Sequence, residues 1–194
     1  MDNQDKVLER EIRLNQLYLG IISKYKEYIE EMEHISIAEL PSLVTPKKEL
    51  IVKKAEEIKG EFGSYVYESH FYEASINAFA YVRDSVLETT MPVQFWLTAE
   101  DTLRFGIGDV IDRNILLCSL LSALGNPSAK VLVSIKEDIR RVLTYYELNG
   151  RAYILDFVSG FRKFESRDAL LKSLNLDDES TAYEFNESLY NEIA

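Results

Sequence analysis

The fold is decided by residues 104–125, RFGIGDVIDRNILLCSLLSALG, where a glycine-rich turn leads into an apolar segment. Asp109 is a residue type that caps the first turn of a helix, and Gly125 is the type that ends one. Enzymes use such helix starts to present a reactive group, because unpaired backbone N–H groups there favour negative charge. The residue after Asp109 is Val110, which carries no reactive group. The sequence therefore predicts a helix over about 109–124 whose start lacks a nucleophile.

The composition is that of a globular chain. Of its 194 residues 46% are hydrophobic and 28% are charged, which is enough apolar material for a sizeable core. No apolar run approaches the roughly 20 residues that span a bilayer. The N-terminus mixes both charges and lacks the apolar stretch of a signal peptide. We expect a cytoplasmic protein with no membrane partner.

Charge, cysteine and histidine content exclude several classes of function. The net charge is −11, and no segment is basic, so a nucleic-acid partner is not expected. Cys118 is the single cysteine, which excludes an internal disulfide and a CxxC-type zinc site. His34 and His70 are the only histidines, and we expect surface or core-edge positions for both. The sequence predicts no cofactor and no bound metal.

The first 60 residues predict two helices. In the first, apolar residues follow 4-3 spacing up to Pro41, which favours a long helix that either lies against the domain or pairs in a coiled coil. The stripe comprises Val7, Leu14, Ile21, Tyr28 and Ile35, with Tyr18, Tyr25 and Met32 between them and Glu11 as a weak point. Thr45 and Pro46 begin the second helix and Gly60 ends it. We expect an N-terminal helical hairpin at 1–60 and a main domain at 61–194.

In the main domain the pattern changes from helical to period two. Four helices are predicted, at about 69–87, directly after the capping residue Thr98, at 109–124 and at 166–174. Three strands are predicted, at 129–135, 140–148 and 151–158. Asn149-Gly150 predicts a tight hairpin between the last two strands. The acidic segment 177–194 is only weakly periodic and predicts no element. Helices followed by an antiparallel sheet predict an α+β fold.

Two stretches together carry a family resemblance. FWLTAEDTLRFGIGDVIDRNILLCSLLSALGNPSAKVLV, followed by LTYYELNGRAYILD, resembles the transglutaminase-like superfamily, a branch of the papain-like cysteine-protease fold. The resemblance covers about residues 73–158. It implies an α+β core of helices packed on an antiparallel sheet, to which the N-terminal helical hairpin is added.

The resemblance also implies three catalytic positions: a cysteine at the helix start, a histidine on one strand and an aspartate on the next. Here the cysteine position is Val110, the histidine position is Arg141, and the aspartate position is kept as Asp156. Without a thiolate and its base, acyl transfer by this route is not expected. The hairpin register places Arg141 diagonal to Asp156 on one face, so we predict an ion pair in place of the histidine–aspartate pair, with a solvated Asp156 as the alternative.

The remaining candidates surround the same helix start. Asp109 and Asp112 stabilise the helix dipole whatever else they do. With Asp101 and Asp156 they are candidate ligands for a divalent cation, although no calcium-loop spacing is present. Gly106 and Gly108 favour tight backbone turning over phosphate binding. Trp96, Phe95 and Phe105 are expected in the core or in the wall of a cleft, whose predicted lining is Trp96, Gly106, Gly108, Asp109 and Asp112.

Three hypotheses for function follow. The first is a non-catalytic transglutaminase-like protein that acts as a binding or scaffolding module and is not an enzyme. Its partner would be a protein, bound through the N-terminal helix or the altered cleft. The second is an enzyme of different chemistry, using carboxylates or a divalent metal in that cleft. The third is a structural oligomer, such as a homodimer, built on the N-terminal helix. The sequence does not name a ligand, a partner or a biological process.

Overall fold

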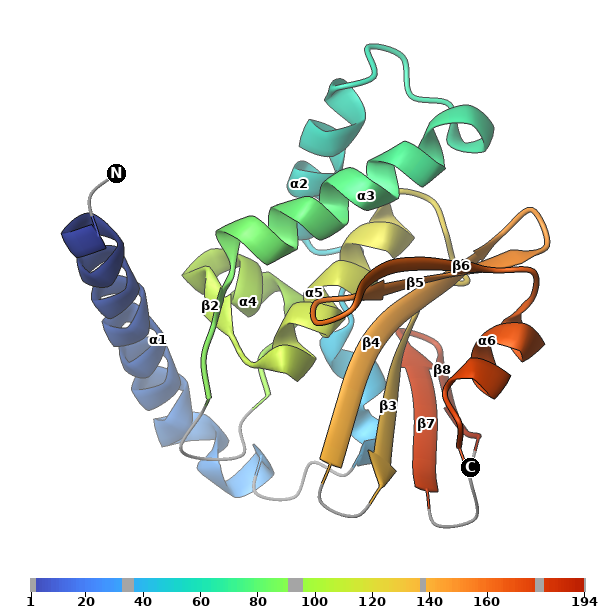
Figure 1. Ribbon diagram of the computed structural model, residues 1–194. Helices are drawn as coiled ribbons and strands as arrows, with labels where there is room; N and C mark the ends of the chain where they lie inside the picture. Colours follow the sequence, from blue (N-terminus) through green and yellow to red (C-terminus); the bar gives the residue numbers. More distant parts are fainter. Residues whose placement is uncertain (1–2, 33–36, 91–95, 137–138, 177–179, 194) are drawn as a thin grey trace.

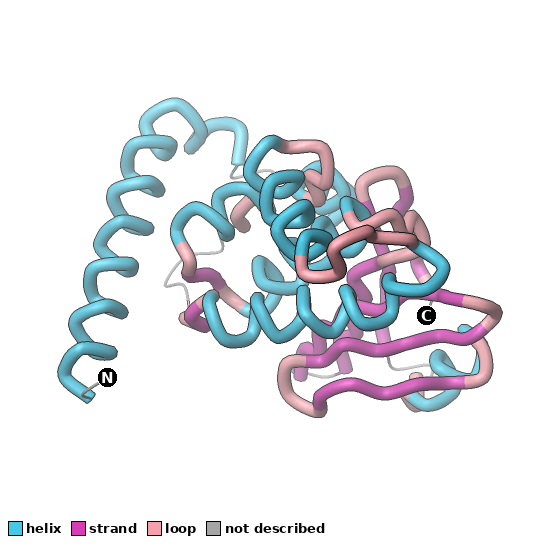
Figure 2. The backbone as a smooth tube through the Cα atoms, turned by 90° about the horizontal axis from the view of Figure 1, so that it is seen from above, coloured by secondary structure: helices cyan, strands magenta, loops and turns pink. Residues whose placement is uncertain are grey.

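A computed structural model describes residues 3–32, 37–90, 96–136, 139–176 and 180–193. A six-stranded antiparallel sheet forms one layer, and helices α2 to α5 form the layer that covers one of its faces (Figure 1). Helix α6 (Arg167–Ser173) packs on the other face. The N-terminal helix α1 (Asn3–Met32) lies at the side, apart from the helices that cover the sheet (Figure 2). The fold is α+β, as the sequence predicts.

Helix α1 lies against the domain, which is one of the two arrangements that its periodicity predicts. Leu17 and Ile21 pack with Leu97 and Ile107 in a small cluster of their own, and the half-buried Leu14 joins them. The predicted stripe is only partly correct, because its member Val7 is 58% exposed. The completely buried Leu17 lies outside the predicted stripe.

Helix α2 belongs to the main core. It spans Glu49–Gly60, after a 3₁₀ segment η1 (Ile37–Leu43). Its buried residues Ile51, Ala55 and Ile58 join the main hydrophobic cluster together with α3 (Tyr67–Ser85) and α5 (Val110–Ala123). The first 60 residues therefore contribute to two hydrophobic clusters. The domain boundary at residue 60 stays a prediction.

The sheet has the order β6-β5-β4-β3-β7-β8. The predicted strands are β3 (Lys130–Lys136), β4 (Ile139–Leu148) and β5 (Arg151–Asp156). Leu148 pairs with Arg151 across the Asn149-Gly150 turn, as predicted. Three further strands were not predicted: β6 (Gly160–Phe164), β7 (Ser180–Asn186) and β8 (Leu189–Glu192). A short parallel pair, β1 (Leu87–Glu88) with β2 (Ile107–Gly108), lies next to α4 (Ala99–Phe105).

The two faces of β4 meet different helices. Thr144 points to α5, where its hydroxyl donates to Asn114 Oδ1 over 2.8 Å. Its neighbour Tyr145 points the other way, where its hydroxyl accepts from Arg167 Nε over 3.1 Å. Because side chains alternate along a strand, even-numbered residues of β4 face α5 and odd-numbered residues face α6. This alternation decides which side chains can reach the start of α5.

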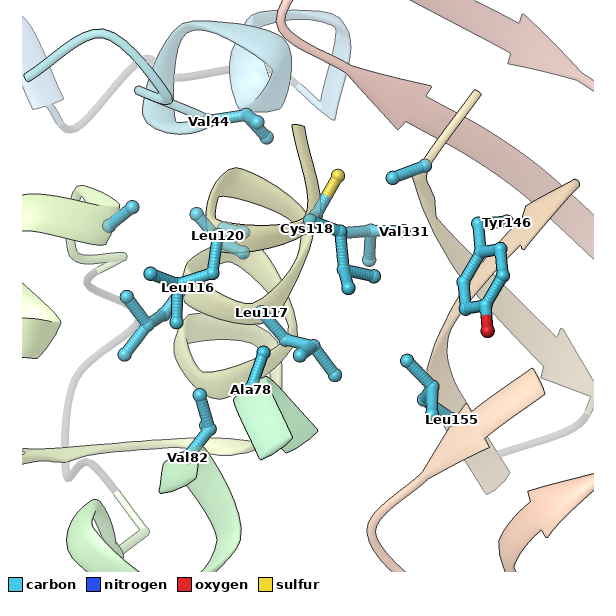
Figure 3. Packing of buried hydrophobic residues seen from close by; sticks show 14 of the residues in the cluster. Val44, Ala78, Val82, Leu116, Leu117, Cys118, Leu120, Val131, Tyr146 and Leu155 are labelled. Carbon is cyan, nitrogen blue, oxygen red and sulfur yellow. The ribbon is translucent and has the colours of Figure 1, made fainter. Parts of the chain in front are cut away.

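Helix α5 forms the centre of the core (Figure 3). Cys118 is completely buried among apolar side chains that include Leu120 and Val131. Burial raises the pKa of its thiol well above the ordinary value, so the thiolate is disfavoured. This confirms Cys118 as a core residue. No helix within the described ranges is long and apolar enough to cross a membrane.

Candidate functional site at the start of α5

Two aspartates fix the first turn of α5 in a reciprocal capping arrangement. The backbone N–H of Asp112 donates to Asp109 Oδ1, and that of Asp109 donates to Asp112 Oδ2, each over 2.9 Å. The other oxygen of Asp112 accepts from the backbone N–H of Leu97 over 2.8 Å. The pair satisfies N–H groups that a helix start leaves free. It also ties α5 to the segment that precedes α4.

Burial dominates the electrostatics of this pair. It raises the pKa of Asp109 against the opposing effects of backbone N–H donors and the nearby Arg140 guanidinium. Asp112 is completely buried, and burial together with the Asp109 charge raises its pKa well above the ordinary value. Carboxyl groups with raised pKa values are common in functional sites, and in structural networks too.

The two glycines before the helix have backbone roles. Gly106 ends α4 with φ 66°, a conformation that residues with a Cβ rarely adopt. At Gly108 a Cβ would approach the Cβ of Asp112 to 2.8 Å. Both glycines therefore let the chain turn tightly beside the capping pair.

Val110 is the first helical residue of α5 and is half-buried against the main core. One turn further along, Arg113 lies with its guanidinium 4.2 Å from the centre of the Phe157 ring and forms an ion pair with Glu88. Phe157 also stacks on Phe79 of α3, with ring centres 5.1 Å apart. The turn after β5 is thereby held beside the first turns of α5. No local sequence signal predicts this contact.

The predicted Arg141–Asp156 ion pair is confirmed, with Arg141 Nη2 3.1 Å from Asp156 Oδ2. The buried carboxylate also accepts from the backbone N–H of Val158 over 2.9 Å and from the Ser159 hydroxyl over 2.6 Å. Burial by itself would raise the pKa of Asp156, but these donors outweigh it and lower the pKa. Asp156 is therefore an anchored anion and not a solvated one.

The ion pair and the start of α5 lie on different sides of the sheet. Arg141 alternates with Leu143 and Tyr145, which pack with α6, and so it faces away from α5. The charged residue of β4 on the α5 side is Arg140, which is exposed and close enough to lower the pKa of Asp109. Arg140 is a site residue that the sequence did not single out.

The other predicted residues have separate places. Trp96 is half-buried and packs against the main core. Asp101 belongs to the cap of α4, where its backbone N–H donates to the Thr98 hydroxyl. His70 accepts the backbone N–H of Val66 at the start of α3, and Phe95 and His34 lie outside the described residues. In the part of the chain that the structure describes, no three or more His, Cys, Asp or Glu residues are grouped so that they could hold a metal ion.

Comparison with known proteins gives a match in structure only. No family model and no curated protein matches the sequence. The chain is similar to EGTA-treated LapG from Legionella pneumophila, with a TM-score of 0.50 and 13% identity over 82% of this chain and 87% of that one. The chain has a transglutaminase-like, papain-like fold. At this identity the likeness holds for the fold alone.

Two further matches score lower. An inferred cysteine protease from Cytophaga hutchinsonii has a TM-score of 0.47 and 14% identity, over 84% of this chain and 56% of that chain. Calcium-bound LapG from Legionella pneumophila has a TM-score of 0.42 and 14% identity, over 72% of this chain and 86% of that chain.

These neighbours correct one expectation. The missing cysteine and histidine led to the prediction that the chain is not an enzyme, and that prediction is wrong. LapG shares this fold at a TM-score of 0.50, and the two missing side chains do not by themselves exclude enzyme activity on it. The prediction rested on the missing thiolate and its base, and it gave less weight to the second hypothesis, an enzyme of different chemistry. A fold can carry different chemistry on other side chains.

Proposed function

We propose that the chain is a binding module that recognises a protein partner at the start of α5. The observation that carries this proposal is the turn after β5. Val158 is 93% exposed at its tip, while the buried Asp156 holds the backbone N–H of that same residue. Val158 is thus an exposed apolar side chain on a turn whose backbone is fixed by a hydrogen bond to Asp156. A group that is held in place before binding loses less conformational freedom when a partner covers it, which favours its use as a contact point.

The groups near the start of α5 have a mixed character. The contact between Arg113 and Phe157 holds the turn beside α5, and the half-buried Val110 and the exposed Arg140 lie at the helix start. We call Val110, Arg140 and Val158 the α5-end surface. Within a chain of net charge −11, an exposed arginine beside apolar groups favours a partner segment that is both apolar and acidic.

The test is affinity capture from native cell extract with the full chain, quantified by mass spectrometry. The matched pair of variants is Val158→Asp and Val52→Asp, since Val52 is also exposed, at 41%, but lies on α2. A partner retained by wild type and Val52→Asp, and lost with Val158→Asp and with Arg140→Glu, supports the α5-end surface. Partners retained equally by all four proteins would contradict it.

A second candidate is carboxylate chemistry at the same helix start. The observation that favours it is the raised pKa of Asp109 in spite of its backbone N–H donors. A raised pKa moves a carboxyl group toward the range in which a general acid or base works. The shared fold with LapG makes this candidate worth testing.

This candidate is tested by incubating the protein with a complex peptide mixture and identifying new termini by mass spectrometry at several pH values. Asp109→Asn is the informative variant and Asp168→Asn, an exposed carboxyl on α6, is its control. Products that depend on Asp109 and not on Asp168 would support catalysis. The same products from wild type and Asp109→Asn would exclude Asp109 as the catalytic group.

A further inference from the structure

Helix α1 has a second apolar face that the domain does not cover. Its four large side chains are 49% to 67% exposed, and they are Leu8, Ile12, Leu19 and Ile22. With Asn15 they follow 4-3-4-3 spacing, so at about 100° per residue they form one stripe along the helix. We call these five residues the outer stripe. Its spacing is that of a helix that pairs with another helix.

The outer stripe is held outward by contacts on the opposite side of α1. A Cβ at Gly20 would collide with the ring of Phe105, so the helix approaches the domain very closely there. Arg13 donates from Nη1 to the carbonyl of Ser85 over 2.7 Å. Leu17 is completely buried on this same inner side. The rotation of α1 is therefore fixed, and the outer stripe faces solvent.

Asn15 identifies the kind of partner. It is exposed at the middle of the outer stripe, and an apolar partner surface would leave its amide without hydrogen bonds, which is costly. A side-chain amide both donates and accepts, so an identical asparagine satisfies it. In a parallel pair of identical helices, Asn15 meets Asn15 while Ile12 and Leu19 meet their counterparts. A second copy of this chain supplies that match.

We infer that two copies of this chain pair in parallel through their outer stripes. The outer stripe is short, but the domain already holds α1 as a helix. Pairing therefore does not have to offset the free-energy cost of forming that helix. Because the domain packs on the inner side of α1, the two domains lie on the outer flanks of the pair. This inference is independent of the α5-end surface.

The test is the solution mass of the full chain by sedimentation equilibrium across about a hundred-fold range of concentration. Wild type is expected to reach twice the monomer mass of 22.4 kDa, and so is Val52→Asp, which changes an exposed valine on α2. Leu19→Asp and Ile12→Asp are expected to stay monomeric, with unchanged far-UV circular dichroism. A monomeric wild type, or a dimeric Leu19→Asp, would overturn the inference.

A cross-link tests the parallel arrangement separately. Cys118 is the single cysteine of the sequence and is buried, so Leu8→Cys adds one accessible thiol near an end of the outer stripe and keeps Asn15. Parallel pairing places the two thiols together, and oxidation is expected to convert most of the dimer to a disulfide-linked form. Val52→Cys is the control and is expected to remain unlinked. A dimer of Leu8→Cys that does not cross-link would overturn the parallel pairing.

Discussion

Arg141 and Asp156 meet 3.1 Å apart at the end of the sheet, on the face that turns away from α5. The same carboxylate holds the turn that displays Val158. The aspartate that the family resemblance assigns to orienting a histidine here fastens a turn to a neighbouring strand. Asp156 therefore has a structural role in this chain, through its contacts with Arg141 and with the turn.

Replacing Asp156 by asparagine is expected to lower the free energy of unfolding at pH 7 by about 1–3 kcal/mol, because a buried, charged acceptor is lost. The pKa of Asp156 is lowered in the folded state. Its contribution is therefore present above the ordinary pKa of about 4 and is lost as the pH falls through the folded-state value. Urea unfolding of both proteins between neutral and acidic pH measures this difference.

The difference between wild type and Asp156→Asn should become smaller as the pH falls. Asp168→Asn is a suitable control, because Asp168 is exposed on α6. That control should show no comparable dependence on pH. A difference that stays constant down to acidic pH would mean that Asp156 is not an anchored anion.

Asp112 should show the opposite dependence on pH. Its folded-state pKa is raised by burial and by the charge of Asp109. As the pH rises above the ordinary pKa of about 4, the unfolded chain loses its proton first, so the wild-type protein loses stability until the folded-state pKa is reached. Asp112→Asn lacks this loss. At low pH the variant is expected to be less stable than wild type, because an amide has one oxygen for the two backbone N–H groups that the Asp112 carboxyl accepts. The stability of the variant is expected to approach that of wild type as the pH rises.

The same urea measurements from acidic to neutral pH test Asp112→Asn. Asp156→Asn and Asp112→Asn then serve as controls for each other. The stability difference between wild type and Asp156→Asn should grow as the pH rises, and that between wild type and Asp112→Asn should shrink. If both differences moved in the same direction with pH, the assignment of opposite pKa shifts would be wrong.

Sequence patterns predicted the elements whose signals are local. The start of α5 follows from Asp109, that of α4 from Thr98, and the hairpin from Asn149-Gly150. Strand β7 was missed because its central Glu184 suggests an exposed position. The structure buries Glu184 at 1% exposure, where donors from three other elements satisfy it. These donors are Lys130, Tyr145 and Arg167.

Helix α1 shows a different limit of prediction. It is apolar on two opposite faces, so periodicity predicts the helix without deciding which face is buried. The decision depends on the close approach of Gly20 to Phe105, residues far apart in sequence. The contact of Arg113 with Phe157, which holds the turn of Val158 beside α5, has the same character. Contacts between distant segments place the candidate surfaces, and no local pattern encodes them.

Gly20→Ala tests how α1 is held. The added methyl group would collide with the Phe105 ring, so α1 must shift or the ring must move. We expect faster amide hydrogen exchange along α1 with little change in α5. Gly60→Ala is the matched control, because nothing lies near a Cβ at that position. Equal exchange in α1 of wild type and Gly20→Ala would show that the close approach does not hold the helix.

Cys118 is expected to report the opening of the core. It is completely buried on α5, and burial raises the pKa of its thiol, so neither access nor thiolate formation favours reaction. A thiol reagent should therefore label native protein only at the rate at which the core opens, and labelling should accelerate steeply in urea.

The control for this measurement is Val158→Cys, which adds a thiol at a position that is 93% exposed. That protein should label in two phases, a fast phase from the added thiol and a slow phase from Cys118. The two phases should merge when the protein is unfolded, since both thiols are then free in water. Native labelling of Cys118 as fast as that of the added thiol would mean that α5 separates readily from β3, and that the start of α5 is not a rigid platform.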